Sequence, residues 1–227
     1  MSLKKRILDQ ARRAIDTKSA FYLFLPKTDT VIDHGLLFNF HYYDSSLIHI
    51  LRSDSQKRKT NPLLPPFDNN VHVCDLTSQR SNHYLLINKY MQCPGHVVIS
   101  SMNTNSNQDS KLSESDFDAF EIVYKAFNFH GILYYNSGLN SGCSQIHKHI
   151  QYSPVENTPL LDAMSRKKVP FIVNHVVEIG QINSQNMMRS YNELLRMAED
   201  DPVHDSYNFI ISKGKAFYVP RKIPRFR

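Results

Sequence analysis

The sequence has no apolar run long enough to cross a membrane. A spanning helix needs about 18 to 20 consecutive apolar residues, whereas short apolar stretches such as 85–87 and 97–99 suit buried strands. Charged residues also fall among the apolar positions of 3–15, so this segment does not resemble a secretory signal peptide. We therefore expect a protein without a membrane partner.

Cysteine is scarce as well, because the chain holds only Cys74, Cys93 and Cys143. An odd number without Cys-x-x-Cys spacing argues against a disulfide framework and against a cysteine-rich zinc site. We expect a reducing, cytoplasmic location, with the nucleus as an alternative. The chain has 227 residues, of which 41% are hydrophobic, which is enough to bury one sizeable core. We accordingly expect a single domain over 1–227.

The charge balance is basic, with a net charge of +6 and a pI near 9.1. Such an excess favours anionic partners such as nucleotides, polyphosphates or nucleic acid. A solvated surface of mixed charge would explain the same excess. The charge therefore acquires meaning only together with a site.

Apolar residues recur with helical spacing in three segments, and strand-like segments lie between them. We predict helices at 3–16, at about 117–127 with Ser113 and Asp116 as a capping pair, and at 184–199 with Ser184 as N-cap. We predict strands at 21–25, 36–43, 83–88, 96–100, 131–135, 145–152, 171–179, 208–211 and 216–219, and a polar, basic loop at 53–61. Strands dominate without alternating with helices, which indicates an α+β fold.

One run of residues carries a chemical signal. It reads Ser-Gly-Cys-Ser-Gln-Ile-His-Lys-His-Ile-Gln from Ser141 to Gln151. Side chains alternate between the two faces of a strand, so His147, His149 and Gln151 should share one face. Burying such groups without partners costs about 1–3 kcal/mol each, and this shared polar face therefore predicts a site.

The chemistry that suits this site is phosphoryl transfer. A neutral imidazole can attack phosphorus, and the preceding loop at 136–145, with Gly138 and Gly142, can present backbone N–H groups to phosphate oxygens. The alternative is a His-x-His metal pair on one strand face. Its further ligands would have to come from elsewhere in the chain, so we rank it lower and expect no metal site.

The run resembles the signature of diadenosine tetraphosphate phosphorylases, also called ATP adenylyltransferases. This family forms the His-x-His-x-Gln branch of the histidine-triad superfamily. Further matches in the family's order are 86–89, His96, 135–138, 207–208 and 219–221, so the resemblance extends over about 62–221. It implies a histidine-triad-like antiparallel sheet with a long central helix, and additional N- and C-terminal elements.

The resemblance also implies roles for individual residues. His149 would be the nucleophile, His147 would orient neighbouring groups, and Gln151 would hydrogen-bond the phosphate. The nucleotide-binding residues would include Asn88, Lys89, Asn136, Gly142, Cys143, Ser144, Gln145, Gln151 and Asn208, together with Lys57 or Lys59 in the basic loop.

The activity that the resemblance implies is phosphorolysis of diadenosine tetraphosphate to ADP and ATP through an AMP-histidine intermediate. The partners would be dinucleoside polyphosphates, ATP, ADP and phosphate rather than nucleic acid. No tightly bound cofactor is expected, although Mg²⁺ would accompany the polyphosphate. The alternatives are a dinucleoside polyphosphate hydrolase, and a nucleotide- or RNA-binding protein that has lost turnover.

Two departures from the family pattern concern the C-terminal part. Lys215 stands where the family has a bulky residue, and the sequence ends at Arg227, before further strands of the family. The expectation from this difference is a pocket in which phosphate contacts dominate. Such a pocket would discriminate weakly between adenine and guanine, and binding would weaken as salt rises.

Overall fold

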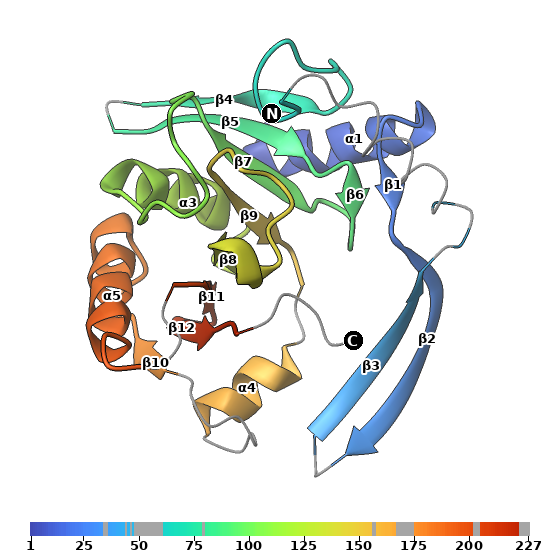
Figure 1. The fold of residues 1–227 in the computed structure, drawn as a ribbon. Helices are drawn as coiled ribbons and strands as arrows, with labels where there is room; N and C mark the ends of the chain where they lie inside the picture. Colours follow the sequence, from blue (N-terminus) through green and yellow to red (C-terminus); the bar gives the residue numbers. More distant parts are fainter. Residues whose placement is uncertain are drawn as a thin grey trace.

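The computed structural model describes residues 1–33, 36–43, 45, 47, 61–78, 80–155, 158–166, 175–201 and 205–222. An antiparallel sheet of eight strands, in the order β10-β12-β11-β8-β9-β7-β5-β4, forms its centre (Figure 1). The strands are β4 (His72–Thr77), β5 (Asn82–Ile87), β7 (Val97–Ser101), β8 (Ile132–Ser137), β9 (His149–Ser153), β10 (His175–Glu178), β11 (Tyr207–Ser212) and β12 (Lys215–Pro220).

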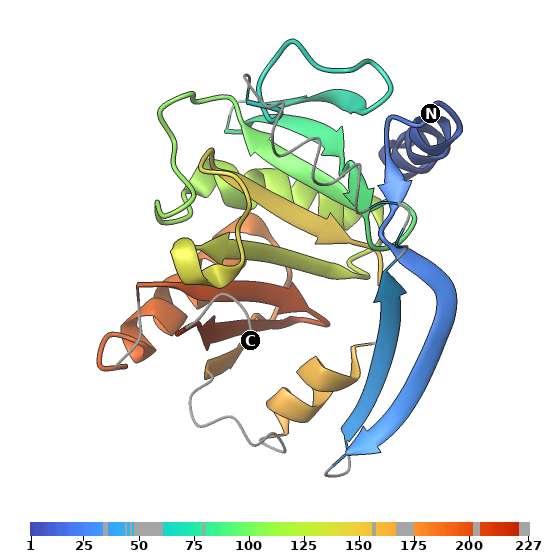
Figure 2. The ribbon, with the colours of Figure 1, turned by 45° about the vertical axis from the view of Figure 1, so that its right-hand side comes forward.

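Three helices cover one face of this sheet. They are α1 (Leu3–Asp16), α3 (Glu114–Ala126) and α5 (Ser184–Met197). Figure 2 shows α3 and α5 behind the strands. Their buried side chains, such as Ile7, Phe120 and Leu194, join one core with Ile150 and Phe209 of the sheet. This core fixes the orientation of the strands, because burying each large apolar side chain stabilises the fold by about 1.5–3 kcal/mol.

The opposite face of the sheet carries two smaller apolar clusters. At one end, α4 (Pro159–Ser165) packs Leu161 and Met164 against Phe217. At the other end, Leu63 packs against Leu86 of β5 and Val98 of β7. In the middle of this face, β9 lies between β7 and β8 and carries His149 and Gln151.

The N-terminal part adds two small sheets. β1 (Phe21–Tyr22) pairs in parallel with β6 (Tyr90–Met91). β2 (Phe24–Asp33) and β3 (Leu36–Tyr43) form a separate antiparallel hairpin that extends toward α4 (Figure 1). A short 3-10 helix, η1 (Leu139–Ser141), interrupts the loop after β8. No helix among the described residues is both long and apolar enough to cross a membrane.

The α+β fold is confirmed, and so is the predicted helix at 3–16. Ser113 and Asp116 form the predicted capping box of α3. The predicted hairpin of 208–211 and 216–219 is present as β11 and β12. The segment at 21–25 is divided between β1 and β2. Residues 53–60 of the predicted loop and 171–174 of the predicted strand lie outside the described residues.

Two of the predicted boundaries are wrong for a reason that the structure shows. The N-cap of α5 is Asn183, whose side chain accepts a hydrogen bond from the Asn186 N–H, and Ser184 is the first helical residue. The strand predicted at 145–152 begins only at His149. Residues 146–148 bond instead to the loop at 106–108, and His147 forms an isolated bridge with Asn107. The loop at 106–108 forms the main-chain hydrogen bonds of these residues in place of a neighbouring strand. Alternating side chains in the sequence are therefore not enough to define where the strand begins.

Candidate functional site

His149 occupies the first position of β9. Only 6% of its surface is exposed, and its Nδ1 atom lies 2.9 Å from the main-chain oxygen of His147. A carbonyl oxygen can only accept, so Nδ1 carries the proton and Nε2 keeps its lone pair. Burial lowers the pKa of His149, and the hydrogen bond to His147 opposes this effect only in part. Burial therefore favours the neutral imidazole, and among the described residues its Nε2 atom has no hydrogen-bond partner.

His147 precedes the strand and is also buried. Its Nε2 atom donates to the Ser101 carbonyl oxygen over 2.7 Å, at the end of β7. Its own carbonyl oxygen accepts from His149. His147 thus contacts the second histidine through its main chain, while its side chain ties the segment to the sheet. The prediction that all three polar side chains share a strand face is wrong for His147, because the strand has not yet begun.

Gln108 is a buried residue that sequence reasoning did not identify. Its Oε1 atom accepts from the His149 N–H over 2.7 Å, and its Nε2 atom donates to the carbonyl oxygens of His149 and Asn136, each over 2.9 Å. β8 pairs with β9 only from Gln151 onward. The side chain of Gln108 therefore replaces the neighbouring strand for His149. A single glutamine in a polar loop gives no sequence signal for this role.

Gln151 lies two residues further along β9 and takes part in a dense hydrogen-bond network. Its Oε1 atom faces Asn88 Nδ2 at 3.2 Å, Tyr134 OH at 3.1 Å and His96 Nε2 at 3.1 Å. Within the described part of the chain, its amide nitrogen forms no hydrogen bond. The NH₂ group of Gln151 is thus available to a ligand.

Lys148, between the two histidines, points to the opposite face of the sheet. Its Nζ atom donates to Asp116 Oδ2 on α3 over 2.7 Å and to the Lys111 carbonyl oxygen over 2.8 Å. His83 Nε2 lies 3.0 Å from the other Asp116 oxygen. Burial alone would raise the pKa of the Asp116 carboxyl, but the contacts of His83 and Lys148 outweigh it and hold this pKa well below its usual range. This buried ion pair attaches the histidine segment to the start of α3.

A cavity of about 430 Å³ opens on the polar middle of the sheet face. His149 and Gln151 line its floor. Its polar and charged lining also includes Ser144, Gln145, Asn88, Lys89, Lys18, Ser19 and Asp68. The rest of the lining consists of Tyr90 and the apolar residues Pro62, Leu63, Pro66, Phe67, Val71, Leu86, Ile87 and Val98. The Ser100 hydroxyl donates to the Leu63 carbonyl oxygen over 2.7 Å and holds the proline-containing segment in place. The cavity therefore has an apolar wall, a polar floor and two lysines.

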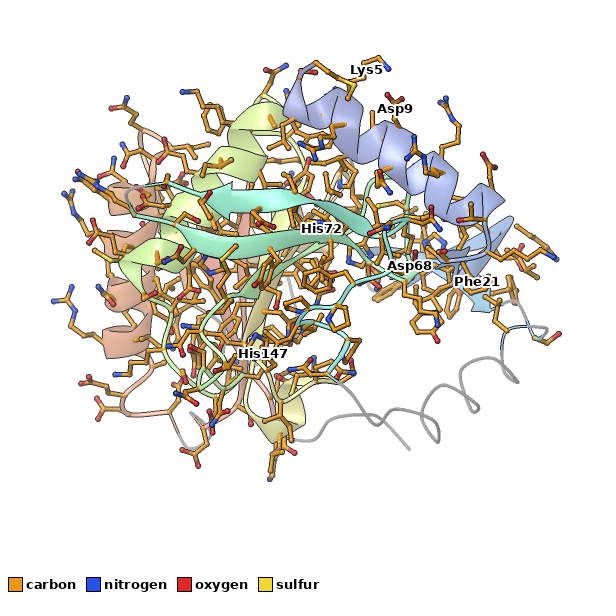
Figure 3. The ribbon with its side chains drawn as sticks, turned by 90° about the horizontal axis from the view of Figure 1, so that it is seen from above. Lys5, Asp9, Phe21, Asp68, His72 and His147 are labelled. Carbon is orange, nitrogen blue, oxygen red and sulfur yellow. The ribbon has the colours of Figure 1, made fainter. Side chains whose placement is uncertain are left out.

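Figure 3 labels Asp68 and His147, which come from separate segments of this region. Lys18 is a second residue that the sequence did not suggest, and it has a positive φ of 59° in the turn after α1. Lys57 and Lys59, the predicted phosphate contacts, lie outside the described residues. In the described part of the chain, Lys18 and Lys89 are the cations that line the cavity.

A second cavity of about 230 Å³ lies on the other side of the loop that follows η1. Ser144 and Gln145 line both cavities. Cys143 lines only the second one, with Asn107, Gln108, Asp109, Gly138, Leu139 and Ile146. Leu139 and Ile146 are 89% and 80% exposed, respectively. A molecule that crosses Ser144 and Gln145 would reach both cavities.

Two glycines shape this loop. Gly138 has a φ of +79°, and a Cβ atom there would collide with the Asp205 carbonyl oxygen and with Ser206 Oγ. Gly142 has a φ of +87° in open space and lines neither cavity. Positive φ values favour glycine, so both positions serve the path of the backbone.

Asn136 and Asn208 bind each other rather than lining either cavity. Asn208 Nδ2 donates to Asn136 Oδ1 over 2.8 Å and to the Ser141 carbonyl oxygen over 2.9 Å. Arg221 donates to Asn208 Oδ1 over 2.7 Å. The pair joins β8 to β11 and supports the loop at Ser141.

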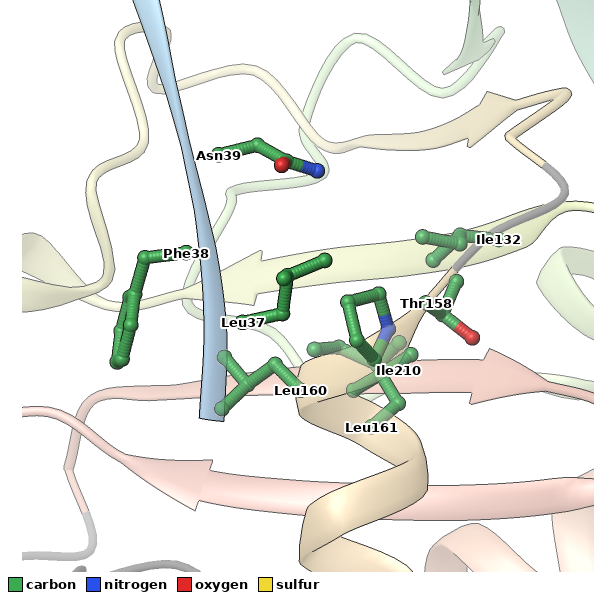
Figure 4. A pocket seen from close by; sticks show the side chains of 9 residues that line it. Leu37, Phe38, Asn39, Ile132, Thr158, Leu160, Leu161 and Ile210 are labelled. Carbon is green, nitrogen blue, oxygen red and sulfur yellow. The ribbon is translucent and has the colours of Figure 1, made fainter. Parts of the chain in front are cut away.

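A third cavity, of about 390 Å³, lies between β3, α4, β8 and β11 (Figure 4). Its lining is apolar, with Leu37, Leu160 and Ile210 among its residues, and it contains no titratable side chain. We therefore place no chemistry there. Across the described residues, no group of three or more His, Cys, Asp or Glu side chains could hold a metal ion.

Comparison with known proteins identifies a family and similar solved structures. Residues 1–178 match the family model described as Ap4A phosphorylase N-terminal domain. Yeast Ap4A phosphorylase Apa2 is similar in structure, with 20% identity, a TM-score of 0.73 and coverage of 98% of this chain and 83% of that chain.

The complexes of the same yeast protein give similar values. With AMP, the identity is 21%, the TM-score is 0.73, and 98% of this chain and 82% of that chain are covered. With Ap4A, the identity is 20%, the TM-score is 0.75, and 98% of this chain and 83% of that chain are covered. The comparison with curated proteins gave no match. At this identity, the structural likeness establishes the fold.

Proposed function

Since this chain belongs to the Ap4A phosphorylase N-terminal domain family, we propose that it is a nucleotidyltransferase that splits diadenosine tetraphosphate with inorganic phosphate. His149 is the nucleophile in this proposal. The observation that carries it is the neutral, buried imidazole whose Nδ1–H is bound to the His147 carbonyl oxygen. Its Nε2 lone pair is thereby left for the cavity that His149 lines.

In the first step, Nε2 of His149 attacks the α-phosphorus. The P–N bond forms as the bond to the bridging oxygen breaks, and ATP leaves with that electron pair. The imidazole ring becomes positively charged while Nδ1–H stays bound to His147. The carbonyl dipole, at 2.9 Å, stabilises this charge.

In the second step, an oxygen of inorganic phosphate attacks the same phosphorus. The P–N bond breaks and its electron pair returns to Nε2, so that ADP is released and His149 is again neutral. The sum is diadenosine tetraphosphate plus phosphate giving ATP plus ADP. Both steps are in-line displacements that depend on positioning more than on acid catalysis.

Gln151 supports this chemistry because its amide can donate a hydrogen bond but cannot release a proton. Its NH₂ group binds a non-bridging oxygen of the α-phosphate in our proposal. An acid is not required when the leaving group is a nucleoside triphosphate, which is stable as an anion. Ser144 and Gln145 line the same cavity and supply further donors to the phosphates.

The rest of the cavity suits the remainder of a nucleotide. The apolar wall of Leu63, Leu86 and Val98 can cover a base, and Lys18 and Lys89 supply positive charge for phosphates. The leaving ATP would extend over Ser144 and Gln145 into the second cavity. Any Mg²⁺ would arrive on the polyphosphate.

The test is incubation of the protein with labelled diadenosine tetraphosphate, with and without inorganic phosphate. The proposal predicts ADP and ATP, and product formation that requires phosphate. AMP and ATP formed without phosphate would instead show a hydrolase. A nucleotide that binds and is not consumed would show a binding protein without turnover.

A further inference from the structure

His96 is a buried histidine outside the signature, located just before β7. Only 2% of its surface is exposed, and its ring lies beside the side chains of Gln151, Tyr134 and Asn88. It is on the same face of the sheet as His149, but it does not line the cavity. Its role must therefore act through its neighbours.

The backbone decides which nitrogen of His96 carries the proton. The Gln92 N–H points at His96 Nδ1 over 3.3 Å. A main-chain N–H can only donate, so Nδ1 must be the accepting nitrogen, and the neutral ring holds its proton on Nε2. Burial lowers the pKa of His96 to about 4, and the hydrogen bond to Gln151 opposes this only in part. The ring therefore stays neutral near physiological pH.

The proton on His96 in turn decides the orientation of the Gln151 amide. Nε2 of His96 lies 3.1 Å from Gln151 Oε1 and 2.8 Å from the Tyr134 oxygen. An Nε2–H donor can use the Gln151 oxygen or the Tyr134 hydroxyl as its acceptor, and that hydroxyl donates in turn to Gln151 Oε1 over 3.1 Å, so both routes place the amide oxygen of Gln151 on this side. In the flipped orientation, the Gln151 NH₂ group would face this donor, which leaves buried polar atoms unpaired at about 1–3 kcal/mol.

Asn88 gives the same orientation independently. The Tyr90 N–H donates to Asn88 Oδ1 over 2.9 Å, so Asn88 must turn its NH₂ group the other way. That group donates to Gln151 Oε1 over 3.2 Å. It also lies 3.2 Å from His96 Nε2, but with the proton on Nε2 these two nitrogens are both donors and do not bond to each other. The main-chain N–H groups of Tyr90 and Gln92 thus orient two donors, Asn88 Nδ2 and His96 Nε2. Both of these donors point at Oε1 of Gln151.

We propose that His96 is a positioning residue that holds the Gln151 amide with its NH₂ group toward the phosphate of a bound nucleotide. The part about phosphate rests on the proposed function, whereas the proton position on His96 does not. The main-chain N–H groups of Tyr90 and Gln92 fix which atoms of Asn88 and His96 donate. These donors hold the oxygen of Gln151, so that its NH₂ group is the donor that faces the ligand.

The first experiment is NMR of the full chain with ¹⁵N-labelled histidine and glutamine. The proposal predicts that the His96 ring is neutral and protonated on Nε2, in long-range ¹H–¹⁵N spectra near neutral pH. It also predicts that the Gln151 side-chain NH₂ signals shift when AMP is added. A His96 ring protonated on Nδ1, or Gln151 side-chain NH₂ signals that do not shift when AMP is added, would overturn it. Neither result depends on turnover.

The second experiment compares variants. His96→Phe keeps a ring and removes the hydrogen bonds of both ring nitrogens. We expect kcat/KM for diadenosine tetraphosphate to fall about 10- to 100-fold, the effect of one hydrogen bond to a charged group. In Gln151→Leu, adding His96→Phe should cause little further loss, because both changes remove the same interaction. Independent, multiplicative losses would contradict the proposal.

Two further variants separate positioning from general damage. His96→Gln places an acceptor and a donor on one carbon, as Nδ1 and Nε2 flank one carbon, and should recover part of the activity. His175→Phe changes a histidine on β10 that contacts Asp201, away from the cavity, and should leave kcat/KM unchanged. If the wild type does not turn over, the proposed function fails, and the NMR result still decides the role of His96.

Discussion

The Nδ1 atom of His149 and the main-chain oxygen of His147 are 2.9 Å apart, so the histidine signature acts through its backbone as well as its side chains. The carbonyl oxygen holds the proton of His149 on Nδ1 and aims Nε2 at the cavity. The His147 side chain, bound to the Ser101 carbonyl oxygen, keeps that main chain in place. In the proposed mechanism, catalysis by His149 therefore depends on the anchoring of His147.

The pH dependence of the reaction should reveal the neutral state of His149. Burial lowers its pKa from the usual 6.5, so the nucleophilic form persists in more acidic solution. We expect kcat/KM to stay level as the pH falls through 6.5 and to decline only below it. Rates measured between about pH 5 and pH 8 test this. An acid limb centred at or above the usual histidine pKa would contradict it.

The stability of the fold should depend on pH in the same region. The folded-state pKa values of His149 and His96 are both depressed, to about 4 for His96, so the unfolded chain binds more protons below pH 6.5. The stability that these two histidines contribute is therefore fully present above pH 6.5 and is lost as the pH falls toward 4. Urea unfolding at several pH values measures this, and His96→Phe should show a smaller loss. Equal losses in the two proteins would contradict the prediction.

The residue at position 151 should influence the acceptor of the second step. Gln151 can only donate to phosphate, whereas a histidine there could also exchange protons with a water molecule. We expect Gln151→His to raise the ratio of AMP to ADP among the products. Chromatography of the products at fixed phosphate concentration measures this ratio. An unchanged ratio at measurable turnover would show that position 151 does not select the acceptor.

Replacing either partner of the buried Lys148–Asp116 ion pair should lower the stability of the fold, but by different amounts. Asp116→Asn leaves the Lys148 ammonium, 7% exposed, without its carboxylate and should destabilise the fold by about 3–5 kcal/mol. Lys148→Met should cost less, because Asp116 keeps His83 and Ser113 as partners.

Adding Lys148→Met to Asp116→Asn should recover part of the stability. Urea unfolding of the three variants supplies the comparison. Equal losses in the two single variants, with additive losses in the double, would show that burial of the Lys148 charge is not the cause.

The second cavity should recognise the nucleoside that leaves with the triphosphate. Leu139→Ala with Ile146→Ala removes two exposed apolar side chains from its rim. We expect kcat/KM for diadenosine tetraphosphate to fall about 3- to 10-fold, since each lost apolar contact contributes a fraction of a kcal/mol or more. Adenosine tetraphosphate, which lacks the second nucleoside, should be turned over at an unchanged rate.

Leu160→Ala is the matched control, because Leu160 is an exposed leucine of α4 outside both of these cavities. It should change neither rate. Equal losses with the two substrates in the rim variant would contradict a nucleoside site at Leu139 and Ile146.

Local patterns predicted much of the fold and of the site. Helical spacing and capping residues suffice for α1 and for the start of α3, and alternation along β9 places His149 and Gln151 on one cavity. The same alternation is wrong for His147, because residues 146–148 bond to the loop at 106–108. The resemblance suggested Asn136 and Asn208 as ligand contacts; the structure pairs them with each other, and their contact with a ligand stays a prediction.

The remaining parts of the site come from contacts between distant segments. Gln108 and His149 are 41 residues apart, His96 and Gln151 are 55 apart, and Asp116 and Lys148 are 32 apart. No local spacing rule relates such pairs. Each side chain is a polar residue with several ordinary explanations, and only the folded sheet brings the partners within hydrogen-bonding distance.

The central claim is that His149 carries the AMP group between the two steps, and the most direct measurement is detection of that intermediate. The protein would be mixed with diadenosine tetraphosphate without phosphate, denatured at alkaline pH, and analysed by intact mass and peptide mapping. The account predicts one added AMP group, located on His149, labile to acid, discharged as ADP when phosphate is added first, and absent from His149→Ala. An adduct on another residue, or phosphorolysis that persists in His149→Ala, would contradict it.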